Sequence, residues 1–263
     1  MTEKNTQLSR FGFSFERGGT HIARTMMLDE LKILLSYVDR PDASKNEYVH
    51  AIRKENCLGK RSGKSRELTY RHLAKLYSLD FTNILFRALR YFWNRDIDGQ
   101  PLLALICTYA RDPLFQSTAP FILQFSEGSI VSRKALEEFI DAQEIGRFSK
   151  ATLTSVAQNI NSTWTQSGHL HGRARKIRTL AKPTPGSVAY ALFLGYLTGA
   201  RGQALFQTEY IKLLDCTSGQ GAELAEEASR KGWIVFKHVD DVIEVLFPNL
   251  MTEEEMEWLR EQN

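Results

Sequence analysis

The stretch of residues 149–180 limits the possible folds of this chain more than any other segment. Within residues 149–166, apolar side chains recur at intervals of three and four, which is the period of an amphipathic helix. These apolar residues are Leu153, Val156, Ala157, Ile160 and Trp164. Gly168 ends the helix, and residues 169–180 are expected to form a β-hairpin that turns at Gly172. A helix followed by a basic hairpin is the order of a winged helix-turn-helix, so we expect that arrangement here.

The helix face opposite the apolar stripe is almost entirely small and polar. Its residues are Thr152, Ser155, Gln158, Asn159, Ser162, Thr163 and Gln166. Such a face gives up some helix propensity, but it suits hydrogen bonding to base edges and phosphate oxygens. We place four cations at or near the hairpin tip, within reach of phosphates or the minor groove: Arg173, Arg175, Lys176 and Arg178. The alternative is a structural hairpin whose charge is incidental.

Charge is distributed unevenly along the chain, although the formal net charge is only +3. Residues 209–263 carry 13 acidic and 5 basic side chains, whereas residues 1–208 carry 18 acidic and 29 basic ones. Residues 145–208 contain no Asp or Glu at all. Their basic residues are Arg147, Lys150, Arg173, Arg175, Lys176, Arg178, Lys182 and Arg201. This run predicts a positive surface with no local neutralisation, which favours an anionic partner. A solvated basic face without function is the competing interpretation.

A second candidate region comes earlier in the chain. We expect helices over residues 44–56 and 64–79, joined by a glycine-bearing turn at 57–63, which is a helix-turn-helix pattern. Cations share a face of the later helix or lie close to it: Arg53, Lys54, Lys60, Arg61, Lys64, Arg66, Arg71 and Lys75. A helix that a preceding helix places in the major groove needs an apolar back and a cationic front. The alternative is a solvated helix face rich in Lys and Arg.

The whole sequence predicts a mainly α-helical, globular fold with two helix-turn-helix or winged-helix-like regions and a few short β-hairpins. We expect an irregular N-terminal arm over residues 1–19, a helical region with the first helix-turn-helix over 20–128, a winged-helix-like region with a buried helix over 129–208, and an acidic C-terminal region over 209–263. The further elements are helices over 20–38, 82–94, 100–110, 132–143, 187–199 and 222–231, a helix that starts at Pro113, strands over 233–236 and 242–247, and an acidic helix that Thr252 caps.

The sequence disfavours several classes of protein. The most apolar stretch, residues 187–199, is too short to cross a bilayer. The N-terminus has no secretory apolar region, and three widely spaced cysteines indicate a reducing compartment, so we expect a cytoplasmic protein. His169 and His171 lack a third ligand at suitable spacing, so we expect no metal. No nucleophile, general base or phosphate loop stands out, so we expect neither enzyme activity nor a cofactor.

Several phrases of the sequence resemble one family. They are NCLGKRS at 56–62, FRALRYFW at 86–93, LLALICTYARDP at 102–113, TAPFIL at 118–123, FSKATL at 148–153, STWTQSGHL at 162–170 and GSVAYALFLGYLTGARG at 186–202. They are similar to the BrxA family, a core component of bacteriophage exclusion (BREX) defence systems. The resemblance implies a helical fold with small wings, helix-turn-helix elements beside positive patches, and DNA binding alongside a DNA methyltransferase and other BREX proteins. The family brings no catalytic residue.

The residues and the resemblance together predict a non-enzymatic BREX component that binds double-stranded DNA and does not enter a membrane. The side chains expected to contact DNA are Lys60, Arg61, Lys64, Arg66, Arg71, Lys75, Lys150, Thr152, Ser155, Gln158, Asn159, Ser162, Arg173, Arg175, Lys176, Arg178 and Lys182. Two alternatives stay open: a protein-interaction scaffold of the defence complex, and an RNA-binding helical protein. Backbone electrostatics alone do not separate DNA from RNA.

Overall fold

The protein is mainly α-helical, as the sequence predicts. The computed structural model describes residues 3–240 and 242–260. Its helices are α1 (Glu3–Phe11), η1 (Thr20–Ile22), α2 (Leu28–Tyr37), α3 (Lys45–Arg53), α4 (Gly63–Tyr77), α5 (Ile84–Trp93), α6 (Gln100–Arg111), α7 (Pro113–Leu123), α8 (Arg133–Gln143), α9 (Lys150–Gln166), α10 (Pro185–Leu197), η2 (Gly202–Gln207), α11 (Glu209–Lys212), α12 (Ser218–Arg230) and α13 (Glu253–Arg260). Its strands are β1 (Ile130–Val131), β2 (Leu170–His171), β3 (Lys176–Arg178), β4 (Val235–Val239) and β5 (Val242–Leu246).

The chain forms two compact units, each assembled from segments that are far apart in the sequence. The terminal unit contains Met1–Phe13, Thr82–Ile106 and Lys182–Asn263, and the winged unit contains Ser14–Phe81 and Cys107–Ala181. The helix α6 therefore begins in the terminal unit and ends in the winged unit. The sequence predicts consecutive regions, whereas packing groups segments that are not neighbours along the chain.

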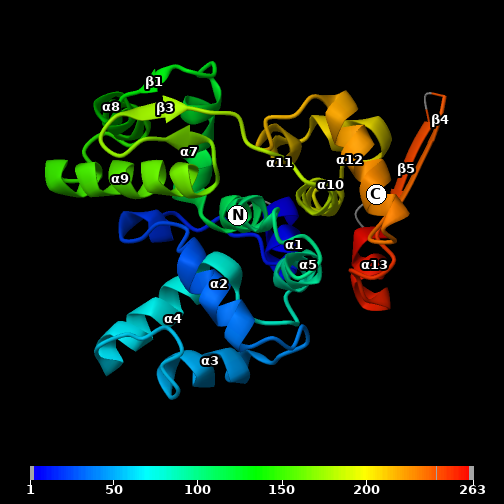
Figure 1. The fold of residues 1–263 in the computed structure, drawn as a ribbon, viewed down its shortest axis with the longest axis horizontal. Coiled ribbons are helices and arrows are strands. Elements are labelled where there is room, and N and C mark those ends of the chain that lie inside the picture. Colours follow the sequence, from blue (N-terminus) through cyan, green and yellow to red (C-terminus); the bar gives the residue numbers. More distant parts are fainter. Residues whose placement is uncertain (1–2, 241, 261–263) are drawn as a thin grey trace. The chain divides into compact units, whose positions relative to one another are not determined.

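The winged unit contains the winged helix-turn-helix that the sequence predicts. Its elements follow in the order α7, β1, α8, α9, β2 and β3 (Figure 1). The strands lie in the antiparallel order β1–β3–β2, so β3 is the central strand, with Ile177 paired to Ile130 on one side and His171 on the other. Each of the three helices begins at a side chain that accepts a hydrogen bond from the backbone N–H three residues later: Asp112, Ser132 and Ser149.

The helices α2, α3 and α4 complete the winged unit. The helix α3 begins with a capping box, in which Glu47 accepts from the Ser44 backbone N–H at 2.8 Å. Ser62 caps α4. The connection between α3 and α4 covers residues 54–62, because α3 ends three residues earlier than the sequence predicts. This loop is longer than the three- or four-residue turn of a helix-turn-helix, so the first region is a helical hairpin with a basic loop.

Two segments near the N-terminus differ from expectation. The predicted irregular arm contains α1, because Leu8 and Phe11 are buried and Gly12, with a φ of 103°, ends the helix only after them. Residues 20–38, predicted as one helix, form η1 and α2 instead. The break is at Met27, whose φ of 54° is left-handed and cannot continue an α-helix. Tertiary contacts of this segment therefore override its apolar period.

The terminal unit is built around α10, almost all of whose residues are buried. Thr184 and Ser187 form a capping box, so α10 begins at Pro185, two residues before its predicted start. The helix α12 starts at Ser218, four residues before its predicted start. The strands β4 and β5 form the predicted hairpin, and Thr252 caps α13.

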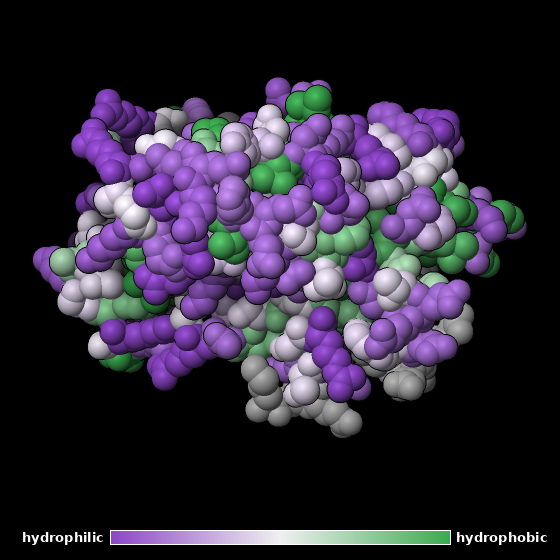
Figure 2. All heavy atoms as spheres, turned by 90° about the horizontal axis from the view of Figure 1, so that it is seen from below, coloured by the Kyte–Doolittle hydropathy of each residue, from purple (hydrophilic) through white to green (hydrophobic). Residues whose placement is uncertain are grey.

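Across residues 3–240 and 242–260, every helix is too short or too polar to cross a bilayer. The face of the molecule shown in Figure 2 is mostly hydrophilic, with its hydrophobic side chains in small, separate groups. Single exposed hydrophobic residues are normal on the surface of a folded protein.

Candidate nucleic-acid interface

Helix α9 presents a polar face to solvent while its apolar stripe is buried. Ile160 and Trp164 are fully buried, as the sequence predicts. Ser155 and Gln158 are exposed on the opposite face, and Ser162, one turn further on, is half-buried. These three side chains are uncharged, so the face offers hydrogen-bond donors and acceptors without repelling phosphate.

One side of α9 is covered by residues 20–28, which periodicity does not reveal. Asn159 donates from Nδ2 to the His21 carbonyl at 3.0 Å. Thr163 is fully buried and accepts from the Met26 backbone N–H at 2.9 Å. Thr152 is half-buried, and its hydroxyl bonds the helix cap at 2.9 Å. The polar groups of Asn159 and Thr152 are thus engaged within the protein, against the prediction that both are available to DNA.

A groove lies where the exposed face of α9 meets the wing and the start of α8. Its volume is about 580 Å³, and its lining includes Gln158 and Ser162 from α9 and the cations Arg133, Lys134, Arg173 and Lys176. The two α8 cations pair with glutamates one turn later at 3.1 and 3.8 Å. The two wing cations have no acidic partner among the described residues. The wing therefore supplies the unneutralised charge of the groove.

The wing holds its cations in different ways. Arg173 and Arg175 are exposed, as predicted. Lys176 is half-buried and donates to Thr165 Oγ1 at 2.9 Å and to the Gly172 carbonyl at 2.7 Å. Burial lowers the pKa of its amine. Lys176 therefore ties the wing to α9, and Arg173 and Arg175 remain the side chains most able to reach a phosphate.

Arg178 does not lie at the wing tip, and the prediction that it contacts DNA is wrong. It is 2% exposed and donates from Nη1 to the carbonyls of His169 and Thr179. The reason is that β3 is the central strand of the sheet, paired with β1 as well as β2. Alternate side chains of a half-covered central strand face the core, and Arg178 has the inward register.

Replacing Arg178 with alanine is expected to lower the free energy of unfolding by about 2 to 4 kcal/mol, because buried carbonyls lose their donor. The matched control is Arg175→Ala, an exposed arginine three residues earlier, for which a change within about 0.5 kcal/mol is expected. Chemical denaturation of the two variants measures the difference. Equal stabilities would contradict the structural role of Arg178.

A buried hydrogen-bond network lies behind α9. His21 Nδ1 is 2.9 Å from Asp112 Oδ2, and His21 Nε2 is 2.8 Å from Thr163 Oγ1. The imidazole stacks on Phe115 with ring centroids 4.6 Å apart. The Asp–His–Thr order resembles a nucleophilic triad, but the three side chains are at most 1% exposed and no substrate reaches them. The network instead fixes residues 20–28 against α9.

Asp112 is the centre of this network. Its Oδ2 accepts from the backbone N–H groups of Thr20 at 2.6 Å and His21 at 3.1 Å, and its Oδ1 accepts from Phe115 at 3.0 Å. Burial acts to raise the pKa of Asp112, but the charge and hydrogen bonds of His21 and the Phe115 N–H outweigh it, so the pKa is lowered. Gly19 provides the space for the Asp112 carboxylate, because a Cβ at position 19 would lie 1.9 Å from Asp112 Oδ1.

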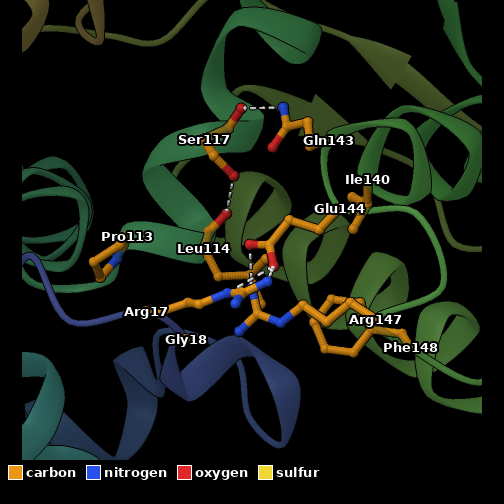
Figure 3. A pocket seen from close by; sticks show the side chains of 10 residues that line it. All are labelled: Arg17, Gly18, Pro113, Leu114, Ser117, Ile140, Gln143, Glu144, Arg147 and Phe148. Atoms are coloured by element: carbon orange, nitrogen blue, oxygen red, sulfur yellow. Dashed lines mark hydrogen bonds and ion pairs between the residues drawn. The ribbon is translucent and has the colours of Figure 1, made fainter.

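A pocket of about 310 Å³ between the start of α7, the end of α8 and the loop after α8 contains a cluster of ion pairs. Figure 3 shows the Glu144 carboxylate between Arg17 and Arg147, and it bonds both, with Arg17 Nε at 2.9 Å. These partners, first the hydrogen bond from Arg17, lower the pKa of Glu144. Glu144 immediately precedes the acid-free run. The charge of Arg147 is therefore neutralised locally, which the run by itself does not predict.

The predicted cations of the first region divide into an exposed and a less available group. The exposed ones are Arg61, Lys64, Arg71 and Lys75. In the second region, Lys150 at the start of α9 is also exposed. Lys60 pairs with Glu30 at 3.0 Å, and Arg66 is half-buried, so neither is as available to phosphate as predicted. Lys182 is exposed but belongs to the terminal unit, not to the winged unit.

Arg24 is a further cation of the winged unit that the sequence pattern does not single out. It is exposed in the loop between η1 and α2. Burial lowers the pKa of His72 on α4, and the charges of Arg24, Arg71 and Lys75 lower it further. These three cations therefore lie close enough to act on one imidazole. A single arginine in a loop belongs to no periodic pattern in the sequence, so only the tertiary packing reveals that it lies near α4.

No protein-family model and no curated protein matches this chain. The resemblance to the BrxA family therefore depends on the phrases themselves. Packing adds a winged helix-turn-helix topology in which an uncharged helix face lies beside two exposed wing arginines and a groove. These features together make the winged unit the candidate functional site.

Proposed function

We propose that this protein is a non-enzymatic component of a BREX phage-defence system that binds double-stranded DNA and acts with a DNA methyltransferase and other BREX proteins. One observation carries the proposal: the winged topology puts the acid-free, solvent-facing side of α9 beside the exposed Arg173 and Arg175. The resemblance to the BrxA family supplies the biological setting.

In this proposal α9 lies in the major groove, where Ser155, Gln158 and Ser162 face base edges. The wing arginines and the N-terminus of α8 hold phosphates on either side. Phosphate contacts dominate such binding, so the affinity falls steeply with salt and depends only modestly on sequence.

The double variant Arg173→Ala/Arg175→Ala is expected to bind all duplexes about tenfold or more weakly at low salt. The slope of log affinity against log salt should fall by up to about 1.8, because each lost phosphate contact removes about 0.9. Fluorescence anisotropy with a labelled duplex at several salt concentrations measures both quantities. The control is Arg230→Ala, an exposed arginine of the terminal unit that pairs with Glu226 at 3.2 Å. Parent-like affinity in the wing variant would remove the wing from the interface.

The β4–β5 hairpin favours the alternative of a protein-interaction scaffold. Val239 and Val242, on either side of its turn, are 68% and 70% exposed. An exposed apolar hairpin suits association with another chain. A pull-down from nuclease-treated cells separates the two functions, since partners that are retained make direct contact and partners that are lost depend on nucleic acid. Competition between matched DNA and RNA duplexes tests the RNA-binding alternative.

A further inference from the structure

Residues 20–28 run between α9 and α4 and bond to both helices. Met26 accepts from the Tyr77 hydroxyl of α4 at 2.5 Å through its carbonyl, and its N–H donates to Thr163 of α9 at 2.9 Å. The element η1 contacts both helices, and Figure 1 shows this blue segment between α9 and the α2–α4 helices. One residue thus links the helix of the winged helix-turn-helix to the helix of the first basic region.

These links are buried, so the spacing between α4 and α9 is fixed. Met26, Tyr77 and Thr163 are fully buried, and Tyr77 also accepts from Thr108 Oγ1 at 3.3 Å. Breaking a buried hydrogen bond leaves a donor or acceptor without water, which costs about 1 to 3 kcal/mol. The two basic regions therefore belong to one compact unit with a fixed spacing between α4 and α9.

The cations of Arg24, Arg71 and Lys75 lie on the α4 side of this unit. All three are exposed. Arg24 lies only two residues before Met26, so it occupies the connection between the two helices. The charges of this trio are little neutralised within the protein. Arg24 Nη1 donates to the uncharged Ala23 carbonyl, and Arg71 Nε lies 3.9 Å from Glu67. The charges are thus free to meet an external anion.

We infer that α4, Arg24 and the winged helix-turn-helix form one continuous surface on which a single DNA duplex lies, with Arg24, Arg71 and Lys75 on its phosphates. The inference rests on the proposed function and extends it. Duplex DNA carries a charge about every 1.7 Å along its axis, so a rigid surface with cations at two places meets phosphates at both. The sequence leaves open whether the two basic regions grip one duplex, and the Met26 connection supports a single duplex.

The test is anisotropy titration of the full chain with a long duplex of about 24 base pairs, roughly 80 Å in length. A unit of this size has a radius of gyration of roughly 15 Å, so this duplex is long enough to span it. The triple variant Arg24→Ala/Arg71→Ala/Lys75→Ala should lose about tenfold in affinity for the long duplex and up to about 2.7 in salt slope. The double variant Arg24→Lys/Arg71→Lys keeps all three charges and should bind the long duplex like the parent.

The outcomes separate the inference from the proposed function. A triple alanine variant that binds the long duplex as the parent does, while the wing variant is weakened, overturns the inference and leaves the proposed function in place. Binding of two long duplexes per chain also overturns it. A parent protein that binds no duplex overturns both. Thermal unfolding of each variant excludes misfolding, since the three side chains are exposed and their removal should leave the melting temperature unchanged.

Discussion

Replacement of Asp112 with alanine is expected to lower the free energy of unfolding by about 3 to 5 kcal/mol, the largest stability change of any variant considered. Removing a buried acceptor leaves each group that bonds to it without a partner, at a cost of about 1 to 3 kcal/mol for each group. Here the Thr20 and His21 backbone N–H groups lose the acceptor that they reach at 2.6 and 3.1 Å, and the His21 imidazole loses its contact at 2.9 Å. Residues 20–28 would then lose their anchor against α9.

The matched control for this variant is Asp42→Ala. Asp42 also pairs with a cation, Arg40 at 3.3 Å, but both side chains are about two-thirds exposed. An exposed pair contributes little to stability, because solvent screens it. Differential scanning calorimetry should therefore show a fall in melting temperature on the order of 10 °C for Asp112→Ala, and little change for Asp42→Ala. Equal shifts would mean that the network is not a source of stability.

The stabilising effect of Asp112 is also expected to depend on pH. Its pKa is lowered in the folded protein, so the ionised carboxylate contributes stability above the unfolded pKa of about 3.9. That contribution is lost as the pH falls through the lower folded value. The difference in unfolding free energy between the parent and Asp112→Ala should therefore be full at pH 7 and shrink below about pH 4. Urea titrations at pH 7, 5 and 3 measure it.

The parts of the fold that the sequence predicts are those whose signal is local. The period of Val156, Ile160 and Trp164 gives α9, and the caps Asp112 and Ser149 give the starts of two helices in the right places. The hairpin after Gly168 follows from alternation and glycine. Each of these signals depends on neighbours within about a dozen residues, so no knowledge of tertiary packing is needed.

The parts that the sequence does not predict depend on contacts between distant segments. Arg178 is buried because β1, a two-residue strand without a pattern of its own, makes β3 the central strand. Asn159 is engaged because residues 20–28 pack over α9, and His21, which accepts its hydrogen bond, lies 138 residues earlier in the sequence. The sequence identifies Asp112 only as a helix cap, because its hydrogen bond with the His21 side chain joins segments that are far apart in the chain. The candidate site therefore has fewer available residues on α9 than predicted, and it gains Arg24, which the sequence did not single out.

A single carboxylate on the exposed face of α9 is expected to abolish most DNA binding. Gln158→Glu is nearly isosteric and adds one negative charge in the groove beside the wing. A like charge that faces phosphate or base acceptors costs several kcal/mol. A cost of about 2 to 3 kcal/mol is a loss of about 30- to 150-fold in affinity. Gln158 is exposed, so the fold should not change.

Two controls make this result specific to α9. Gln203→Glu makes the same change at an exposed position of the terminal unit and should leave affinity unchanged. Gln158→Ala removes the amide without adding charge, so it should alter the preference among duplex sequences while keeping the salt slope. If Gln158→Glu bound duplex DNA as tightly as the parent, α9 would not face the DNA. This conclusion would hold even if the wing arginines contacted the DNA. Charge repulsion on α9 and charge loss on the wing thus test the two halves of the proposed interface separately.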